Sequence, residues 1–348
     1  MLKEVGGGML DERKMMVLQA IIDDYIHSAE PVGSRTIARR YKLGVSPATI
    51  RNEMADLEET GYIVQPHISA GRIPSDKGYR FYVDMLMKPQ EISKEERKQM
   101  QHKEMNRQQQ TDQVIQETCK LLALFTQYIA VVVAPPVNAC VLKHIQLVPI
   151  DDTNILVVMV LNPGMVQNRI IRTNIGYSAG ELSHISEQLN QRLRGITYRE
   201  IGSTLIKDIR DNFGDIGIAL LEIIAGELGE SGHEQMYLNG AIQIFNQPEF
   251  KDINRVRPLL SILEEKQIVS SVLNDLAKVT GVQVAIGHEN NRVEIQECSV
   301  VTSTYSVGGE VIGAIGVIGP TRMEYAKVFS AVDLLANSLS EILSELVK

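Results

Sequence analysis

The sequence predicts a multidomain α+β protein whose N-terminal part, residues 9–88, folds as a winged helix-turn-helix. The chain has 348 residues, of which 44% are hydrophobic and 22% charged, so it is long enough for two or three domains with ordinary cores. Three helical patterns followed by a hairpin pattern open the chain, which is the element order of a winged helix. Strand patterns then lie on both sides of a helix-rich middle, which is typical of one α+β domain interrupted by an insertion.

Apolar spacing and capping residues define the three N-terminal helices. The predicted ranges are 11–30, 34–41 and 46–60. Ser34 is the expected N-cap of the second helix, and Ser46 is that of the third, with Pro47 as its first helical residue. In the third helix the residues expected to face the core, from their helical spacing, are Ile50, Met54 and Leu57.

A hairpin and a fourth helix complete this part of the chain. Residues 62–64 and 72–74 are predicted to pair around a turn at Ser69–Gly71, and a helix capped by Ser75 should follow. Pro89 marks the domain boundary. Residues 89–111 are almost wholly polar, so we expect a solvated linker there, either a helix or a hinge.

The remaining patterns predict a second, interrupted domain. The expected strands are 129–134, 142–149, 154–161, 166–172, 282–286, 299–305 and 311–318. Helices are predicted within about 180–230 and at the C-terminus, where Val328 begins a long apolar repeat. We therefore expect the second domain to consist of residues 112–194 and 281–348, with residues 195–280 inserted between its halves.

The charge distribution favours a nucleic-acid-binding function for the N-terminal part. The whole chain carries a formal net charge of -8, but residues 31–80 hold eight Lys and Arg against five Asp and Glu. A local basic patch is enough for phosphate contacts, while an acidic remainder stays off the DNA. The alternative is a winged helix that binds another protein through the same charges.

The third helix is the expected recognition helix. If Ile50 and Met54 face the core, a rotation of about 100° per residue places other side chains on the base-facing side. Those are Ala48, Asn52 and Ala55, flanked by Thr49 and Arg51. Asn bonds adenine, Arg bonds guanine, and Ala packs on the thymine methyl; each good bidentate contact discriminates by about 1–3 kcal/mol.

Basic residues around this helix are expected to contact phosphate. They lie on the second helix and the turn after it, on the hairpin, and on the fourth helix. The complete set of expected DNA-binding residues is Arg35, Arg39, Arg40, Lys42, Ser46, Ala48, Thr49, Arg51, Asn52, Arg72, Tyr79 and Arg80.

Other function classes find little support in the sequence. Three widely spaced cysteines form no C-x-x-C pair, so neither a disulfide framework nor a structural zinc site is expected. The glycines of 308–319 lack both the G-x-G-x-x-G pattern and a G-K-[ST] ending. There is no H-E-x-x-H and no G-x-S-x-G, so we expect neither an enzyme nor a bound metal or cofactor. The apolar run 128–133 is too short to span a membrane, and we expect a soluble, cytoplasmic protein.

Two long motifs stand out in the sequence. The first comprises Pro31–Ser34, Gly44–Glu58 and Ser69–Arg80, and the second is Gly316–Tyr325. In both motifs the chain resembles the HrcA family, the heat-inducible repressors of bacterial chaperone operons. Because these motifs lie at opposite ends, the resemblance covers nearly the whole chain except residues 1–8.

The resemblance implies a GAF-like second domain and an inserted domain that dimerises. It further implies a homodimer that binds an inverted-repeat operator upstream of the chaperonin and DnaK operons. The GroE chaperonin would keep the repressor active, and its titration by unfolded protein would release repression. One alternative is a winged-helix repressor controlled by a small molecule in the GAF-like domain. Another alternative is a DNA-binding domain fused to an enzyme, as in biotin-ligase repressors. This sequence lacks the glycine- and arginine-rich nucleotide loop that such an enzyme needs.

Overall fold

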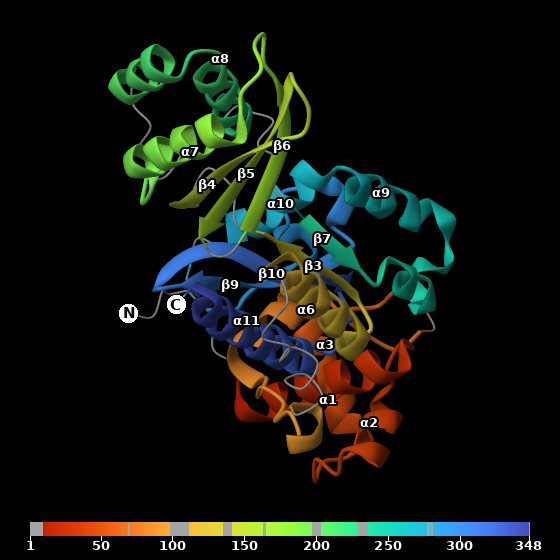
Figure 1. The fold of residues 1–348 in the computed structure, drawn as a ribbon. Helices are drawn as coiled ribbons and strands as arrows, with labels where there is room; N and C mark the ends of the chain where they lie inside the picture. Colours follow the sequence, from red (N-terminus) through yellow and green to blue (C-terminus); the bar gives the residue numbers. More distant parts are fainter. Residues whose placement is uncertain are drawn as a thin grey trace.

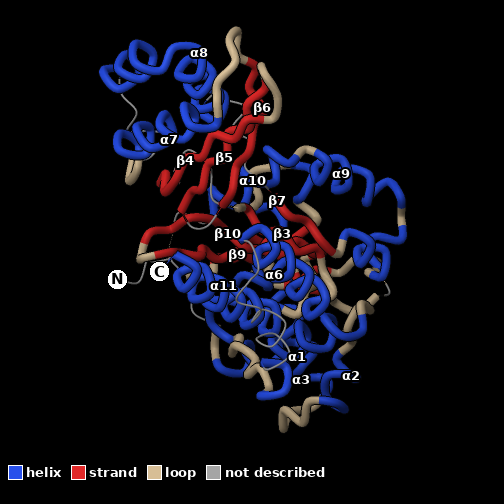
Figure 2. The backbone as a smooth tube through the Cα atoms, viewed as in Figure 1, coloured by secondary structure: helices blue, strands red, loops and turns tan. Residues whose placement is uncertain are grey.

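Three parts of the protein are each built around a different β-sheet in the computed structural model (Figure 1). They are an N-terminal module with a two-stranded hairpin, a central body with a five-stranded sheet, and an inserted unit with a three-stranded sheet. The structure describes residues 10–347 except 69, 98–110, 135–140, 163–164, 197–202, 229–235, 277–278 and 280. Helices and sheets together confirm the predicted α+β class (Figure 2).

The N-terminal module has the predicted order of helices and strands. Its elements are α1 (Glu12–Ser28), α2 (Ser34–Arg40), α3 (Pro47–Glu59), β1 (Ile63–Val64), β2 (Ile73–Pro74), α4 (Asp76–Phe81) and the π-helix η1 (Tyr82–Leu86). Side-chain caps begin three of the helices: Asp11 in α1, Ser46 in α3 and Ser75 in α4. The predicted cap of α2 is wrong by one residue, because Ser34 is already helical and Gly33 precedes it.

The hairpin is tied to the segment between α1 and α2. Val32 and Arg72 exchange two backbone hydrogen bonds of 2.9 Å, which adds a bridge beside the β1–β2 pair. Gly71 permits this approach, since a Cβ there would lie 2.5 Å from the carbonyl oxygen of Val32. The hairpin is therefore held against the helices at its base.

The central body is an antiparallel sheet in the order β7-β3-β10-β9-β8 with helices on both faces. Along β3, Ala130 and Val132 face α6 and α11, whereas Val131 and Val133 face α9 and α10, as the two-residue period of a strand requires. Its elements are α6 (Thr111–Thr126), β3 (Ile129–Val133), β7 (Met236–Asn239), η4 (Ala241–Asn246), η5 (Pro248–Lys251), α9 (Ile253–Glu264), α10 (Lys266–Leu276), β8 (Gln283–Ile286), η6 (Gly287–Glu289), η7 (Val293–Ile295), β9 (Cys298–Val307), β10 (Glu310–Pro320) and α11 (Tyr325–Val347).

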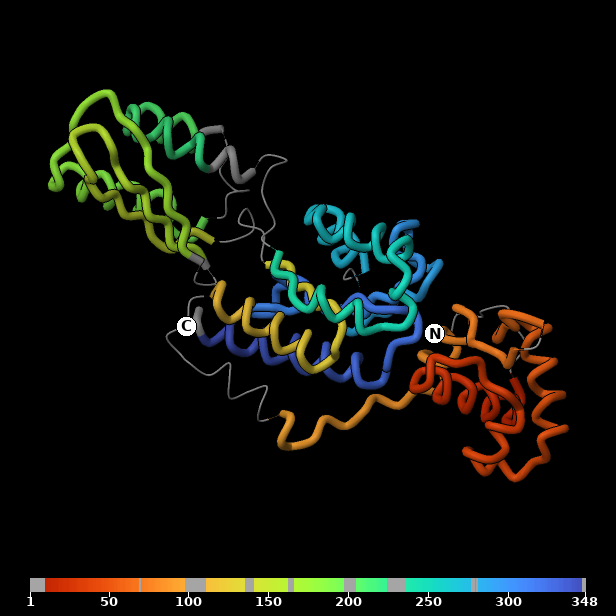
Figure 3. Tube along the Cα trace, turned by 90° about the vertical axis from the view of Figure 1, so that its right-hand side faces the viewer, coloured from red at the N-terminus to blue at the C-terminus, as the bar shows by residue number. Residues whose placement is uncertain are grey.

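The inserted unit has its own sheet and its own core. Its elements are β4 (Val141–Pro149), β5 (Asn154–Asn162), β6 (Met165–Arg172), α7 (Ala179–Leu193) and α8 (Ser203–Leu228). The inner side chains of β5, such as Val157 and Met159, share one apolar cluster with Leu189 of α7 and Phe213 of α8. In Figure 3 this unit and the N-terminal module lie at opposite ends of the molecule.

The predicted limits of the insertion, residues 195–280, are wrong. The chain leaves the five-stranded sheet after β3 and returns to it with β7, whose Leu238 pairs with Val131. Strands β4, β5 and β6 pair only with one another among the described residues. The described insertion therefore runs from 141 to 228, and α9 and α10 belong to the body. The sequence pattern of an apolar strand predicts its length and its buried face. It does not predict which sheet the strand joins.

Only part of the predicted linker, 89–111, can be compared with the structure, because residues 98–110 lie outside the described ones. Beyond η1, the amide of Gln90 donates to the carbonyl of Ala326 at 3.2 Å. Helix α6 begins at Thr111. The start of the linker thus runs along the beginning of α11.

Candidate nucleic-acid interface

The turn between α2 and α3 fixes how α3 leaves the module. Lys42 and Gly44 both have positive φ, 42° and 72°, so the chain reverses within a few residues. Ser46 then caps α3: its Oγ accepts from the amide of Thr49 at 3.1 Å. The Ser46 and Thr49 hydroxyls also lie 2.9 Å apart. A cap of this kind typically stabilises a helix by about 1 kcal/mol.

Helix α3 has a buried face and a solvent face, as its spacing predicted. Ile50, Met54 and Leu57 are buried, which confirms the expected inward face. The side chains exposed on the opposite side are Ala48, Arg51, Asn52 and Ala55, and Thr49 is half-buried. The chemistry needed to read base edges is therefore presented to solvent on one helix.

Exposed cations without an ion-pair partner among the described residues lie on α2, on the turn after it and on α3 itself. Arg35, Arg39, Lys42 and Arg51 are exposed, and none forms an ion pair with a described carboxylate. Two acidic residues of α3 are paired with a cation of α1. Glu53 and Asp56 lie 3.3 and 3.1 Å from the Lys14 ammonium of α1. These two carboxylates are thereby offset, while the exposed cations of α2, α3 and the turn between them keep their positive charge.

Two other predicted phosphate contacts, Arg40 and Arg72, form ion pairs inside the module. Arg40 lies 2.5 Å from a carboxylate oxygen of the buried Asp24, which ties α2 to α1. The Arg72 guanidinium lies 2.7 Å from Glu58 and so fastens the hairpin to α3. Neither partner could be inferred from local sequence, because Asp24 and Glu58 are 16 and 14 residues away from their arginines.

Tyr79 and Arg80, which were expected to contact DNA from the fourth helix, face the central body instead. Tyr79 is only 2% exposed, and its ring centroid lies 5.7 Å from that of Tyr325 in the body. Burial raises the pKa of Tyr79 well above its ordinary value, so its hydroxyl stays neutral. Arg80 donates to Glu289 and to the carbonyl of Val284, also in the body. Helix α4 packs against the body, and this contact could not be inferred from helical spacing alone.

The tip of the hairpin is a feature that sequence reasoning missed. Ile68 is 100% exposed there, and His67 beside it is also exposed. The Gln65 amide donates to the carbonyls of Ile68 at 2.9 Å and Ala70 at 3.1 Å, which shapes the tip from within. The predicted turn gave its position, but not which side chains project from it; Ser69 lies outside the described residues.

The described part of the chain shows no metal-binding group and no reactive thiol. No group of three His, Cys, Asp or Glu residues there is placed to hold a metal ion. Burial raises the pKa of the Cys119 and Cys298 thiols to about 12, so both stay protonated and unreactive at neutral pH. Among the helices described, none combines the length and apolar character that a membrane crossing requires.

Comparisons with known proteins agree on one class. The family model "HrcA protein C terminal domain" matches residues 112–329. "Heat-inducible transcription repressor HrcA" of Pelotomaculum thermopropionicum is 47% identical over 342 residues, which cover 97% of this chain and 98% of the relative. The protein of the same name from Desulforamulus reducens is 43% identical and covered to 99%, again with 97% of this chain.

These relatives define the class as transcription repressors. The chain belongs to the HrcA family of heat-inducible transcription repressors. A crystal structure of a hypothetical protein shares the fold, with a TM-score of 0.68 at 24% identity. That match covers 97% of this chain and 100% of the other.

Proposed function

We propose that this chain represses chaperonin and DnaK operons by binding an inverted-repeat operator as a homodimer, with its N-terminal module acting as a winged helix. The observation that carries the proposal is the solvent face of α3. Asn52 and Arg51 are exposed there, and the cations of α2 and of the turn that leads into α3 are exposed as well. In this arrangement α3 would read bases in the major groove while Arg35, Arg39 and Lys42 contact phosphate.

A homodimer fits the proposal because an inverted repeat requires two-fold symmetry. The inserted unit offers a surface for it. On the outer face of its sheet Val148, Leu156 and Ile170 form a row across three paired strands. Val148 and Ile170 are 39% and 65% exposed. An apolar sheet face of this kind suits a partner of the same composition, here the same face of a second copy.

We propose further that a chaperonin keeps this repressor active, as the resemblance to the HrcA family implies. The central body, which we regard as the GAF-like domain, supports it in one respect. Its strand β3 is entirely buried, yet both neighbouring strands come from distant parts of the chain. Non-local strands pair slowly and leave apolar surface exposed meanwhile, which is the state that a chaperonin binds.

A binding assay on operator and scrambled DNA tests the reading helix. We expect Asn52→Ala to weaken operator binding by about tenfold or more with little effect on scrambled DNA, since one base contact contributes about 1–3 kcal/mol. Arg39→Ala should weaken both alike and flatten the salt dependence by about one unit. Asn246→Ala, an exposed asparagine of the body, is the matched control. Equal losses on both DNAs from Asn52→Ala would refute the assignment.

Refolding from denaturant tests the chaperonin. Operator binding by the full chain should recover several-fold faster when GroE and ATP are supplied, because aggregation competes with slow strand pairing. Recovery at the same rate without chaperonin would remove that part of the proposal and favour control by a small ligand. A thermal-shift assay with metabolites would then be the next measurement.

A further inference from the structure

The N-terminal module contacts the central body through residues that are remote from the solvent face of α3. We call this surface the module–body contact. Its residues are Ile26, Asp76, Tyr79 and Arg80 of the module, with Gly287, His288, Glu289, Arg322 and Tyr325 of the body. Asp76, Tyr79 and Arg80 belong to the first of the two sequence motifs and Arg322 and Tyr325 to the second, whereas Ile26 and residues 287–289 lie outside both.

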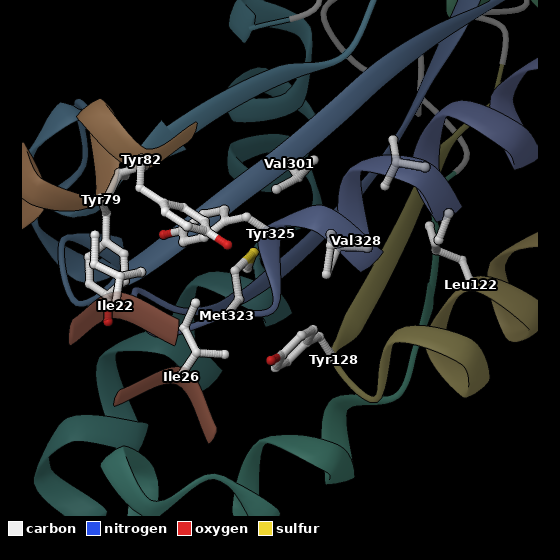
Figure 4. Close-up of a cluster of buried hydrophobic side chains, with 14 of the residues drawn as sticks. Ile22, Ile26, Tyr79, Tyr82, Leu122, Tyr128, Val301, Met323, Tyr325 and Val328 are labelled. Carbon is white, nitrogen blue, oxygen red and sulfur yellow. The ribbon is translucent and has the colours of Figure 1, made fainter. Parts of the chain in front are cut away.

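An apolar centre and a buried arginine form the first half of the contact. Tyr79 lies against Tyr325, with Ile22, Ile26 and Met323 close by (Figure 4). The Arg322 side chain, 10% exposed, donates to the carbonyl of Ile26 in the last turn of α1. Because the final carbonyls of a helix carry partial negative charge, a guanidinium there stabilises the helix end.

Glu249 of the body holds that arginine in place. Its carboxylate accepts from Arg322 Nε at 2.6 Å and from a terminal nitrogen at 3.3 Å. The guanidinium is thus paired within the body before it reaches the module. The body therefore sets the direction in which Arg322 meets the last turn of α1.

Two polar pairs form the other side of the contact. Arg80 donates from Nε to Glu289 at 2.8 Å and from a second nitrogen to the carbonyl of Val284 at 2.6 Å. Asp76 accepts from the amide of His288 at 3.0 Å, and its carboxylate lies 2.8 Å from the His288 ring. Gly287, with φ 53°, permits this approach, since a Cβ there would lie 2.2 Å from the Asp76 carboxylate.

These contacts fix an orientation as well as a position. They involve α1, Asp76 and Arg80 on the module side and three segments of the body, so a rotation of the module breaks at least one of them. The solvent face of α3 takes no part, and Asn52 and Arg51 remain exposed while the module is docked. The docked arrangement is therefore compatible with DNA binding.

We propose that the module–body contact positions the recognition helix: it holds α3 in one orientation relative to the body, so that a dimer fits only one spacing of half-sites. Arg80, Asp76 and Arg322 are positioning residues in this scheme. The inference rests on the proposed function, because spacing matters only to a dimer on an inverted repeat. The inserted unit and the module lie at opposite ends of the molecule, so any rotation at this contact changes the distance between the two recognition helices of the proposed dimer (Figure 3).

A pair of charge reversals beside Arg80 tests this scheme. Glu289→Arg places a cation against Arg80 across the contact. Asp84→Arg is the matched control, because Asp84 pairs with Arg80 at 3.2 Å from inside the module. Each full-length protein is titrated with duplexes that carry the wild-type inverted repeat, with the spacer altered by up to about half a helical turn, and with a single half-site.

The wild type and Asp84→Arg should lose at least about tenfold in affinity when the spacer changes, since only one half-site then engages. Glu289→Arg should bind the best spacer more weakly and lose less than about threefold on the altered ones. All three proteins should bind the half-site equally. The positioning role is overturned if Glu289→Arg keeps the wild-type spacing preference, or if it loses half-site and full-site binding in equal measure. If the wild type itself binds no inverted repeat, the proposed function fails, which is a distinguishable result.

Discussion

The N-terminal module and the inserted unit are attached to the central body in opposite ways. Apolar residues of the module, such as Leu18 and Ile22, belong to the same continuous cluster as Val328 and Leu335 of α11. The inserted unit closes a cluster of its own around Val157, Leu189 and related residues. The module proposed to read DNA therefore depends on the body for part of its burial, whereas the unit proposed to dimerise has a core of its own.

Separating the parts should produce the largest effect. A fragment that ends at Lys88 is expected to bind operator at least about 100-fold more weakly than the full chain. It lacks the unit proposed to dimerise, so each molecule engages only one half-site of the operator. It also leaves Tyr79 and Ile26 exposed to water. Gel-shift titration at equal salt measures the affinity.

Fusing the same fragment to an unrelated dimerising coiled coil separates the two causes. Full recovery of affinity would mean that the body contributes only dimerisation. That result would contradict the proposed positioning role of the module–body contact. A fragment that matches the full chain without any fusion would contradict the dimer itself.

A charge on the open sheet face of the inserted unit should have the next largest effect. Ile170→Asp is expected to weaken the dimer by at least about tenfold, because it buries an unpaired charge in an apolar interface. Its fold should be unaffected, since Ile170 is 65% exposed in the single chain. Sedimentation equilibrium measures the dimer. The control is Ile175→Asp, at a 59% exposed isoleucine beyond β6, and equal dissociation of both variants would exclude the sheet face.

Two tyrosines of the module should show the smallest effect, with opposite signs. The Tyr79 hydroxyl is buried without a hydrogen-bond partner among the described residues, so Tyr79→Phe should raise the free energy of unfolding by up to about 1 kcal/mol. The Tyr82 hydroxyl donates to Asp23 at 3.0 Å, so Tyr82→Phe should lower that free energy by about 1 kcal/mol. Urea unfolding of the full chain measures both. Changes of the same sign would mean that Tyr79 has a partner in solution.

The same comparison explains what could be read from the sequence. Helix α3 follows from local signals alone: Ser46 caps it and Ile50, Met54 and Leu57 mark its buried face. The strands of the inserted unit were also located to within a few residues, because alternation and turns are local. Their assignment to a sheet was wrong, because pairing of β7 with β3 depends on residues about a hundred positions apart.

The candidate interface shows the same division. Exposure of Asn52 and Arg51 followed from helix periodicity. The burial of Tyr79 did not, because its partner Tyr325 lies far along the chain. A tyrosine and an arginine after a helix cap fit both a DNA contact and a contact between domains. Only the tertiary structure distinguishes these two roles.

Strand β3 also has a consequence for synthesis on the ribosome. Val131 pairs with Leu238 on one side and Gly316 on the other, so its second neighbour is translated about 185 residues later. At about 5–20 residues per second, that interval lasts roughly 10–40 s. The three strands of the inserted unit are complete within a short stretch of nascent chain and need not wait. A buried strand therefore leaves the exit tunnel long before both of its neighbours exist.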